Sequence, residues 1–145
     1  MPTFTTGSLV NLKKLHPLLQ KLFVEAIKEY DFIISDSMRG RIAQTKAFAT
    51  GHSKVKFGQS AHNWNPGLAA DIYPAPFSTR TPISKFETMQ IKVIKPLAAR
   101  LKIQIRQGID FNMNGNLSDD KWDDAPHVEL FPWREFAKSA KLFEG

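Results

Sequence analysis

Cysteine is absent from this chain of 145 residues, so it can form neither a disulfide framework, nor a thiolate metal site, nor a cysteine nucleophile. Any metal ion would have to be held by histidine, aspartate or glutamate. Long apolar runs are also lacking, and the N-terminus does not have the basic start and apolar core of a secretory signal. We therefore expect a protein without a membrane span that is made in the cytoplasm without a signal peptide.

Acidic residues are in deficit, since 14 Asp and Glu stand against 20 Lys and Arg and leave a net charge of +6. This balance favours polyanionic surroundings such as nucleic acid, acidic lipid or an anionic cell-wall polymer, and charge alone does not choose among them. The basic residues are dispersed and no zinc-finger or RNA-binding motif is present, so we expect no stable nucleic-acid complex. Length and a hydrophobic content of 42% predict one domain, residues 1–145, and we expect a monomer.

Periodicity predicts helices at residues 12–30, 41–50 and 84–101, and strands at residues 32–35, 68–73, 103–109 and 127–131. We expect Ser84 to cap the third helix with Glu87 as its capping-box partner, and Pro96 to kink or break that helix. Pro132 should open a short closing helix. Helices before and between several short strands predict an α+β fold in which helices flank a small, largely antiparallel sheet.

Three residues stand in contexts typical of one metal site, namely His62, Asp71 and His127. Two imidazoles and a carboxylate are a common ligand set for catalytic zinc, with a fourth position open for water. Taken singly, each residue is more simply explained as a surface histidine or a turn-forming aspartate, but the constellation together favours a metal site. Because side chains alternate along a strand, Asp71 and His127 can meet only if their two strands lie close in the sheet.

A hydrolytic metal site also needs a group that takes a proton from water and delivers it to the leaving amine. Asp124 lies three residues before His127 and is our candidate for this base. Asp123 and Glu129 are weaker candidates, although Glu129 should share the strand face of His127.

The pattern Ser-x-His, Gly-x-Ala-x-Asp and Asp-x-Pro-His resembles the LAS metallopeptidases. This group includes D-alanyl-D-alanine carboxypeptidases, VanX-like and VanY-like dipeptidases, and phage L-alanyl-D-glutamate endopeptidases. Residues 39–44 resemble the family's Arg-[Ser/Thr]-x-x-x-Gln segment, and residues 51–54 its Gly-x-Ser turn. Residues 105–111 resemble a Gly-Gly-Asp-Trp stretch of the endopeptidase branch, so similar segments extend from residue 39 to residue 130.

The resemblance implies the LAS, hedgehog-like peptidase fold and assigns a role to each matching residue. The implied zinc ligands are His62, Asp71 and His127, and the implied catalytic base is Asp124. By the same resemblance, Arg39 holds a substrate carbonyl or carboxylate and stabilises the oxyanion. Gln44 and Ser60 are implied as supporting residues for substrate binding. Trp64 lies beside the site in sequence and is our candidate for a substrate contact. The chain departs from the family pattern at residues 63–66, a spacer two residues longer than usual, and at Gly40, which replaces Ser or Thr.

Within the family, the endopeptidase-like segment favours a peptidoglycan hydrolase of the phage endolysin type that cuts the L-Ala to D-Glu bond of the stem peptide. Such a protein would act on the periplasmic cell wall after holin-type release, and its charge would favour anionic wall or outer-membrane polymers. Two alternatives stay open: a D-alanyl-D-alanine carboxypeptidase, and a non-catalytic zinc-containing module that binds cell wall or nucleic acid.

A second ion site is indicated by residues 110–120, which match the first half of a calcium loop. The candidate calcium ligands are Asp110, Asn112, Asn114 and Asn116. The twelfth position is Lys121 where such loops carry glutamate, so Asp119, Asp120 or Asp123 would have to substitute. Asn-Gly is also a common hairpin turn, and both interpretations stay open.

Overall fold

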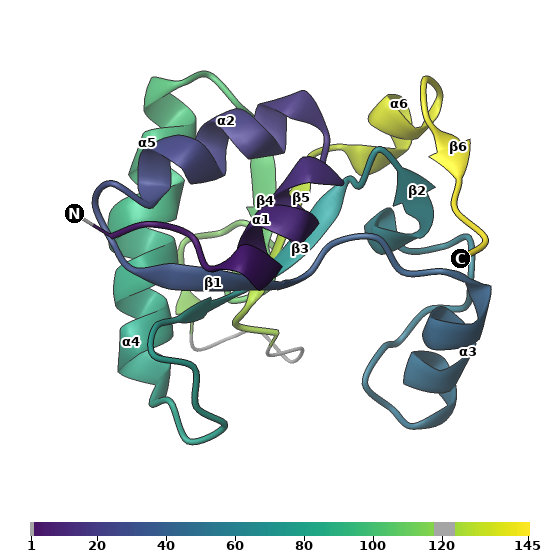
Figure 1. Cartoon of the computed structure of the whole chain (residues 1–145), viewed down its shortest axis with the longest axis horizontal. Helices are drawn as coiled ribbons and strands as arrows, with labels where there is room; N and C mark the ends of the chain where they lie inside the picture. The colour runs from purple at the N-terminus through teal and green to yellow at the C-terminus, as the bar shows by residue number, and fades with distance from the viewer. Residues whose placement is uncertain (1, 118–123) are drawn as a thin grey trace.

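The computed structural model describes residues 2–117 and 124–145 (Figure 1). Its elements are α1 (Thr6–Lys13), α2 (Pro17–Ala26), β1 (Phe32–Asp36), α3 (Arg41–Ala49), the 3-10 helix η1 (Ala61–Asn63), β2 (Trp64–Asn65), β3 (Ala69–Pro74), α4 (Ile83–Glu87), the π-helical segment η2 (Thr88–Ile94), α5 (Lys95–Arg100), β4 (Ile105–Gln107), β5 (His127–Leu130), α6 (Trp133–Ala137) and β6 (Lys141–Leu142). Within the described residues, no helix is long and apolar enough to cross a membrane.

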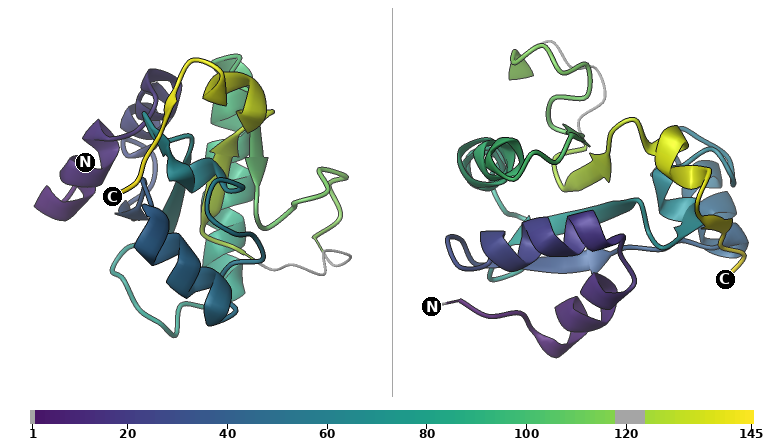
Figure 2. Two further views of the ribbon diagram at one scale, coloured as in Figure 1. Left: turned by 90° about the vertical axis from the view of Figure 1, so that its right-hand side faces the viewer. Right: turned by 90° about the horizontal axis from the view of Figure 1, so that it is seen from above.

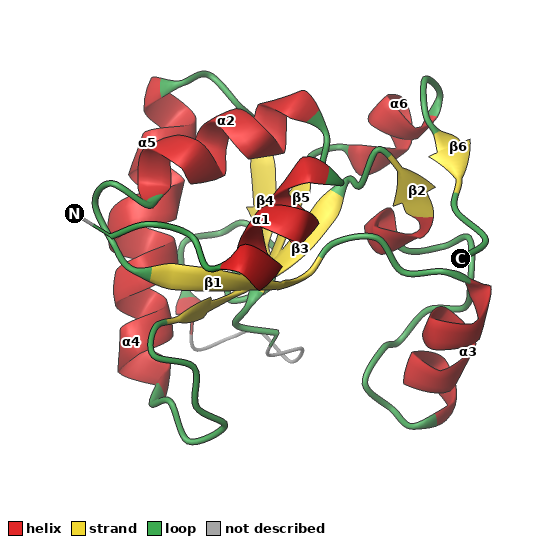
Figure 3. Cartoon of the chain, viewed as in Figure 1, coloured by secondary structure: helices red, strands yellow, loops and turns green. Residues whose placement is uncertain are grey.

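A four-stranded antiparallel sheet in the order β1-β3-β5-β4 forms the centre of the fold. The long helix from α4 to α5 packs beside α2 at one end of the sheet, while α3 lies at the opposite end of the molecule (Figures 1 and 2). Between α2, η2 and the sheet lies an apolar core whose fully buried side chains include Leu19, Phe23, Ile72, Met89 and Leu130. The predicted α+β fold with an antiparallel sheet flanked by helices is confirmed (Figure 3).

The central strands of the sheet agree with the sequence prediction. Four predicted elements, the strands at residues 32–35, 68–73 and 127–131 and the helix at 41–50, match β1, β3, β5 and α3 to within one residue at each end. The strand predicted for residues 103–109 is shorter, because the chain turns at Gly108. The small pair β2-β6 was not predicted, since two-residue strands leave no periodic signal.

The single helix predicted for residues 12–30 is wrong, because the structure has two helices there, α1 and α2. Pro17 has no N–H to continue α1 and instead begins α2, and His16 caps the new helix by accepting the Leu18 N–H at 3.0 Å. The backbone of the break is hydrogen-bonded to Gly67, whose N–H donates to Lys14 and whose carbonyl accepts from His16, both at 2.8 Å. The interruption thus fixes the chain just before β3.

The predicted cap of the helix at 84–101 is also wrong, since Pro82 occupies the cap position and helix α4 begins at Ile83 without a side-chain cap. Pro96 lies in the first turn of α5, directly after the π-helical segment η2. A proline cannot donate to the carbonyl four residues before it, and the wider π-helical register accommodates that loss without breaking the helix.

The same π-helical segment contacts the chain that leads to the sheet's edge. Buried Gln90 donates its amide to the carbonyl of Ala125 at 2.9 Å, and Gln107 donates to the side-chain and backbone oxygens of Gln90, both at 2.8 Å. The turn before β5 is therefore attached to both η2 and β4.

Candidate active site

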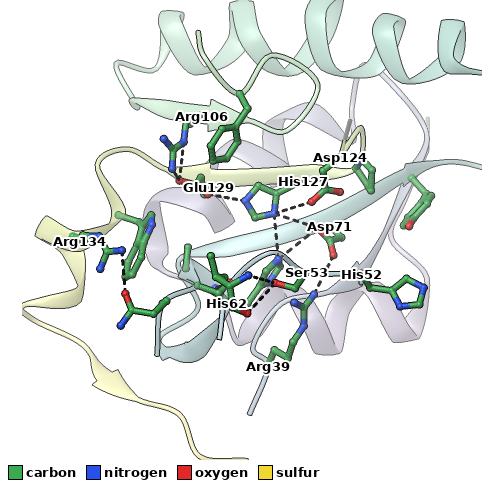
Figure 4. A pocket seen from close by; sticks show the side chains of 18 residues that line it. Arg39, His52, Ser53, His62, Asp71, Arg106, Asp124, His127, Glu129 and Arg134 are labelled. Carbon is green, nitrogen blue, oxygen red and sulfur yellow. Dashed lines mark hydrogen bonds and ion pairs between the residues drawn. The ribbon is translucent and has the colours of Figure 1, made fainter. Parts of the chain in front are cut away.

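Strands β3 and β5 bring two of the predicted ligands face to face. Asp71 pairs directly with His127 across the ladder, as the expectation of adjacent strands requires. His62 enters from η1 (Figure 4). Its Nε2 lies 3.3 Å from His127 Nδ1, and Asp71 Oδ1 lies 3.5 Å from each of these nitrogens.

Both imidazoles have their outward nitrogens committed to hydrogen bonds. His62 Nδ1 lies 2.8 Å from the carbonyl of Ser37, which can only accept, so Nδ1 carries the hydrogen and Nε2 presents a lone pair. His127 Nε2 lies 2.7 Å from Glu129 Oε1, which leaves Nδ1 to face Asp71. Asp71 Oδ1 is buried without a hydrogen-bond partner among the described residues. Three acceptors thus converge within 4.8 Å of one another, an arrangement that fits a metal cation.

The pKa values reflect this convergence. Burial by itself would lower the pKa of His127, but the nearby carboxylates of Asp71 and Glu129 outweigh burial and raise that pKa to about 10. Burial would likewise raise the pKa of Asp71, yet His62 and His127 lower it below its usual range. The shared negative charge that favours a proton on His127 would also favour a metal ion at this point, so proton and metal would compete for the site.

Behind His127 lies an ion pair that sequence reasoning did not anticipate. Glu129 is 4% exposed, and its Oε2 accepts from Arg106 Nε at 3.1 Å and from Nη2 at 2.8 Å. The Arg106 guanidinium lies 3.9 Å from the centre of the Phe111 ring. The shared face of His127 and Glu129 was predictable, but the pairing of Arg106 with Glu129 depends on the register of β4 against β5, which the sequence does not reveal.

Arg39 reaches the site from the loop before α3. Its Nη2 lies 2.9 Å from Asp36 Oδ2 and 3.7 Å from Asp71 Oδ2, and its backbone N–H donates to the carbonyl of His62 at 2.7 Å. Gln44 is fully buried behind it, with Oε1 accepting from Arg39 Nη1 at 3.1 Å and the amide donating to Ser53 Oγ at 2.9 Å. Gln44 therefore fixes Arg39 and does not line the pocket.

Asp124 lies at the edge of the triad, with Oδ2 3.9 Å from His127 Nδ1. Burial raises the pKa of its carboxyl group, and the positive charge of His127 opposes this only in part. Gly108 makes room for Asp124, because a Cβ atom at residue 108 would overlap the backbone of Asp124. Asp123, the weaker candidate for the base, lies outside the described residues.

One pocket of about 430 Å³ opens over the triad and is also lined by Arg39, Arg106, Asp124 and Glu129. Ser60 lines it and accepts the His62 N–H with its Oγ at 3.2 Å. Trp64 does not line it, because the longer spacer forms β2, which pairs with β6 and turns Trp64 toward Trp133 with ring centres 6.3 Å apart. Trp133 faces the pocket in its place.

Sequence comparison agrees with this geometry. A family model described as phage L-alanyl-D-glutamate peptidase matches residues 2–131. The chain belongs to this family. No match was found among curated proteins. Among solved structures, the L-Ala D-Glu endopeptidase ChiX of Serratia marcescens is similar in fold, with a TM-score of 0.71 and 19% identity over 93% of this chain and 94% of that one.

As a member of the L-alanyl-D-glutamate peptidase family, the chain is a peptidase that hydrolyses peptidoglycan, and its buried His-Asp-His group can bind a metal ion. The endopeptidase prediction is thereby confirmed. The departure at Gly40 also has a local explanation, because a Cβ atom there would lie 2.6 Å from the carbonyl oxygen of Glu144 in the C-terminal segment.

The structure describes the predicted calcium loop only as far as residue 117. Asp119, Asp120, Lys121 and Asp123 lie outside the described residues. Asp110 is 5% exposed and accepts the Gly115 N–H with Oδ2 at 2.9 Å, while its Oδ1 has no hydrogen-bond partner among the described residues. Asn112 and Asn114 each accept the N–H two residues ahead, at 3.3 and 2.8 Å. Asn116 is exposed at the end of this series.

Proposed function

We propose that the metal ion is zinc, that its ligands are His62 Nε2, Asp71 Oδ1 and His127 Nδ1, and that the site cuts the L-Ala to D-Glu bond of the peptidoglycan stem peptide. The convergence of three acceptors, one of them a buried oxygen without a partner, carries the proposal. Two imidazoles and a carboxylate are a ligand set that suits zinc, and the set leaves room for further ligands. A bound zinc ion would supply Lewis acidity for the amide carbonyl and would make water nucleophilic near neutral pH.

Asp124 acts as the general base in this proposal. Its carboxyl group lies beside the triad without being a ligand, and its raised pKa suits a group that first accepts a proton from water and then delivers it to the leaving amine nitrogen of D-Glu. Gly108 keeps the backbone of Asp124 close to β4, so the position of the base is set by the sheet edge.

Arg39 stabilises the negative charge that develops on the carbonyl oxygen. Its guanidinium lies in the pocket wall with Asp36 and Gln44 on either side, which removes most of the freedom of a long side chain. Gln44 and Ser60 are positioning residues, the first for Arg39 and the second for His62. Trp133, not Trp64, supplies an aromatic wall to the substrate.

The scissile bond is tested by digesting purified peptidoglycan with the zinc-loaded enzyme and identifying the new termini. We expect free L-Ala carboxyl groups and free D-Glu amino groups in equal amounts. Release of D-Ala would instead assign the chain to the carboxypeptidases, and the absence of any new terminus would leave a binding module.

We further propose that residues 1–145 act as one monomeric catalytic domain that is made in the host cytoplasm and reaches the periplasmic wall through holin-type release. The shared core of helices and sheet supports the single domain. We also propose adhesion to anionic wall or outer-membrane polymers. Residues 37–70 support it, because this stretch contains five Lys and Arg residues and no Asp or Glu.

A calcium ion at Asp110, Asn112, Asn114 and Asn116 is a separate proposal. The unpartnered buried oxygen of Asp110 supports it, because a buried carboxylate oxygen normally has a hydrogen bond or a cation. Calorimetric titration of the zinc-loaded protein with Ca²⁺ should show one site that Asp110→Asn weakens. Equal heats for both proteins would leave the loop as an Asn-Gly turn.

A further inference from the structure

Three arginines line the pocket, and two of them already have a carboxylate partner. Arg39 is paired with Asp36 at 2.9 Å, and Arg106 with Glu129 at 2.8 Å. Arg134, on α6, has no carboxylate within ion-pair distance in the part of the chain that the structure describes. A new anion in the pocket would have to compete with a resident carboxylate at the first two arginines, and it meets no such competitor at the third.

Arg134 is nevertheless supported by its neighbours. Its guanidinium carbon lies 4.4 Å from the centre of the Trp133 ring, and Nη2 donates a weak hydrogen bond to Gln59 Oε1 at 3.4 Å. Stacking on an aromatic ring orients the planar guanidinium and leaves its edge free for a two-point contact with a carboxylate. The long Gln59 contact is one that a charged oxygen can readily replace.

Arg134 and the proposed base lie on different sides of the triad (Figure 4). Asp124 and Arg134 flank the cluster of His62, Asp71 and His127 from opposite directions, and both line the same pocket. A peptide held with its scissile amide at the triad can therefore reach Arg134 on the side away from Asp124.

The substrate class supplies an anion. Glutamate has two carboxyl groups, so a D-Glu residue that is joined to the rest of the stem peptide through one of them keeps the other as a free carboxylate. The C-terminus of the stem peptide is a second carboxylate. We propose that Arg134 binds a carboxylate of the stem peptide and makes the enzyme selective for acidic over amidated peptides, an inference that rests on the proposed function of the site.

The test compares soluble stem peptides that differ in one carboxyl group. One peptide carries both free carboxylates, the second has the free D-Glu carboxyl as a primary amide, and the third has its C-terminal carboxyl as a primary amide. We expect zinc-loaded wild type to cut the fully acidic peptide with a kcat/KM roughly two- to five-fold above that for one of the amides, as an exposed charge pair predicts. The amide that is disfavoured identifies which carboxylate Arg134 binds.

In Arg134→Gln the ratio of kcat/KM for the acidic peptide to that for the disfavoured amide should fall to about one, because kcat/KM drops mainly for the acidic peptide. Arg134→Lys should keep part of the wild-type ratio. Arg100→Gln, an exposed arginine on α5 away from the pocket, should keep the full wild-type preference. A preference that survives in Arg134→Gln, an equal loss on all three peptides, or a wild type without any preference would overturn the inference. Failure of wild type to cut any peptide would instead contradict the proposed function itself, and the inference would fall with it.

Discussion

At the scale of single residues, the site is defined by which nitrogen of each histidine faces inward. Ser37 and Glu129 hold the outward nitrogens of His62 and His127, so both inward nitrogens are placed to offer lone pairs to a metal cation beside Asp71. Motif spacing was enough to predict that His62, Asp71 and His127 come together. Glu129 was predictable as a neighbour of His127 because both lie on one face of the same strand, whereas the contact of Ser37 with His62 depends on segments that only the folded chain brings together.

Glu129 should strengthen metal binding through His127. In Glu129→Gln the side chain loses its charge, the imidazole becomes a poorer ligand, and we expect zinc affinity to fall by roughly 10- to 100-fold. Competition with a chromophoric chelator measures the change. Glu135→Gln, an exposed residue on α6, serves as the matched control and should bind zinc like wild type. Equal affinities for both variants would show that the contact has no influence on the metal.

Asp124 should act on the reaction and not on the metal. In Asp124→Asn no carboxylate remains to take the proton, and hydrolysis should fall by roughly 10²- to 10⁴-fold. Zinc content, measured by atomic spectroscopy on the same samples, should stay at one ion per chain. Hydrolysis at the wild-type rate would reject Asp124 as the base, while loss of zinc would make it a ligand.

At the scale of elements, the active site depends on how β4, β5 and the π-helical segment are joined. Gln90 holds the turn before β5, and Gly108 lets the backbone of Asp124 approach the end of β4. Neither relation is visible in the periodicity of the sequence, because both are contacts between segments that are separated along the chain. The break at Pro17 was visible in principle, and the apolar pattern on both sides of it led to the wrong single helix.

Gly108→Ala should displace the base while leaving the ligands in place. The added Cβ overlaps the backbone of Asp124, so the carboxyl group has to move. A shift of about 1 Å should lower the rate of peptide hydrolysis by roughly 100-fold. Gly7→Ala, where a Cβ would meet no atom within 4 Å, is the control and should retain full activity. The assay is peptide hydrolysis at saturating zinc, with thermal melting to confirm folding. Equal activity of the two variants would contradict the claim that the close approach of Asp124 to Gly108 positions the base.

At the scale of the whole molecule, charge is unevenly distributed. The acid-free stretch of residues 37–70 includes α3, whose exposed Arg41 and Lys46 lie at the end of the molecule opposite α5 (Figure 1). The net charge of +6 was evident from composition, whereas its concentration at one end became clear only with the fold. The α+β class and the order of the main strands along the chain were predictable, since the periodic segments were long enough to identify.

Adhesion to anionic polymer should therefore be sensitive to salt and to the charge of the α3 region. The double variant Lys46→Gln with Lys56→Gln should sediment less with anionic cell-wall material at low salt, and the difference should shrink as salt rises. Lys92→Gln with Lys95→Gln, at the other end of the molecule, is the matched control. Hydrolysis of a short soluble peptide should not change in either pair. Equal sedimentation of both pairs would argue against a role for this region.

The central claim is that a zinc ion held by His62, Asp71 and His127 makes this chain a peptidase, and stepwise return of zinc to chelator-treated protein tests it most directly. Cleavage of stem peptide between L-Ala and D-Glu should rise in proportion to zinc and saturate at one ion per chain, and His127→Ala should neither retain that ion nor cut the peptide. Full activity before zinc is added, or a metallated and active His127→Ala, would contradict the account.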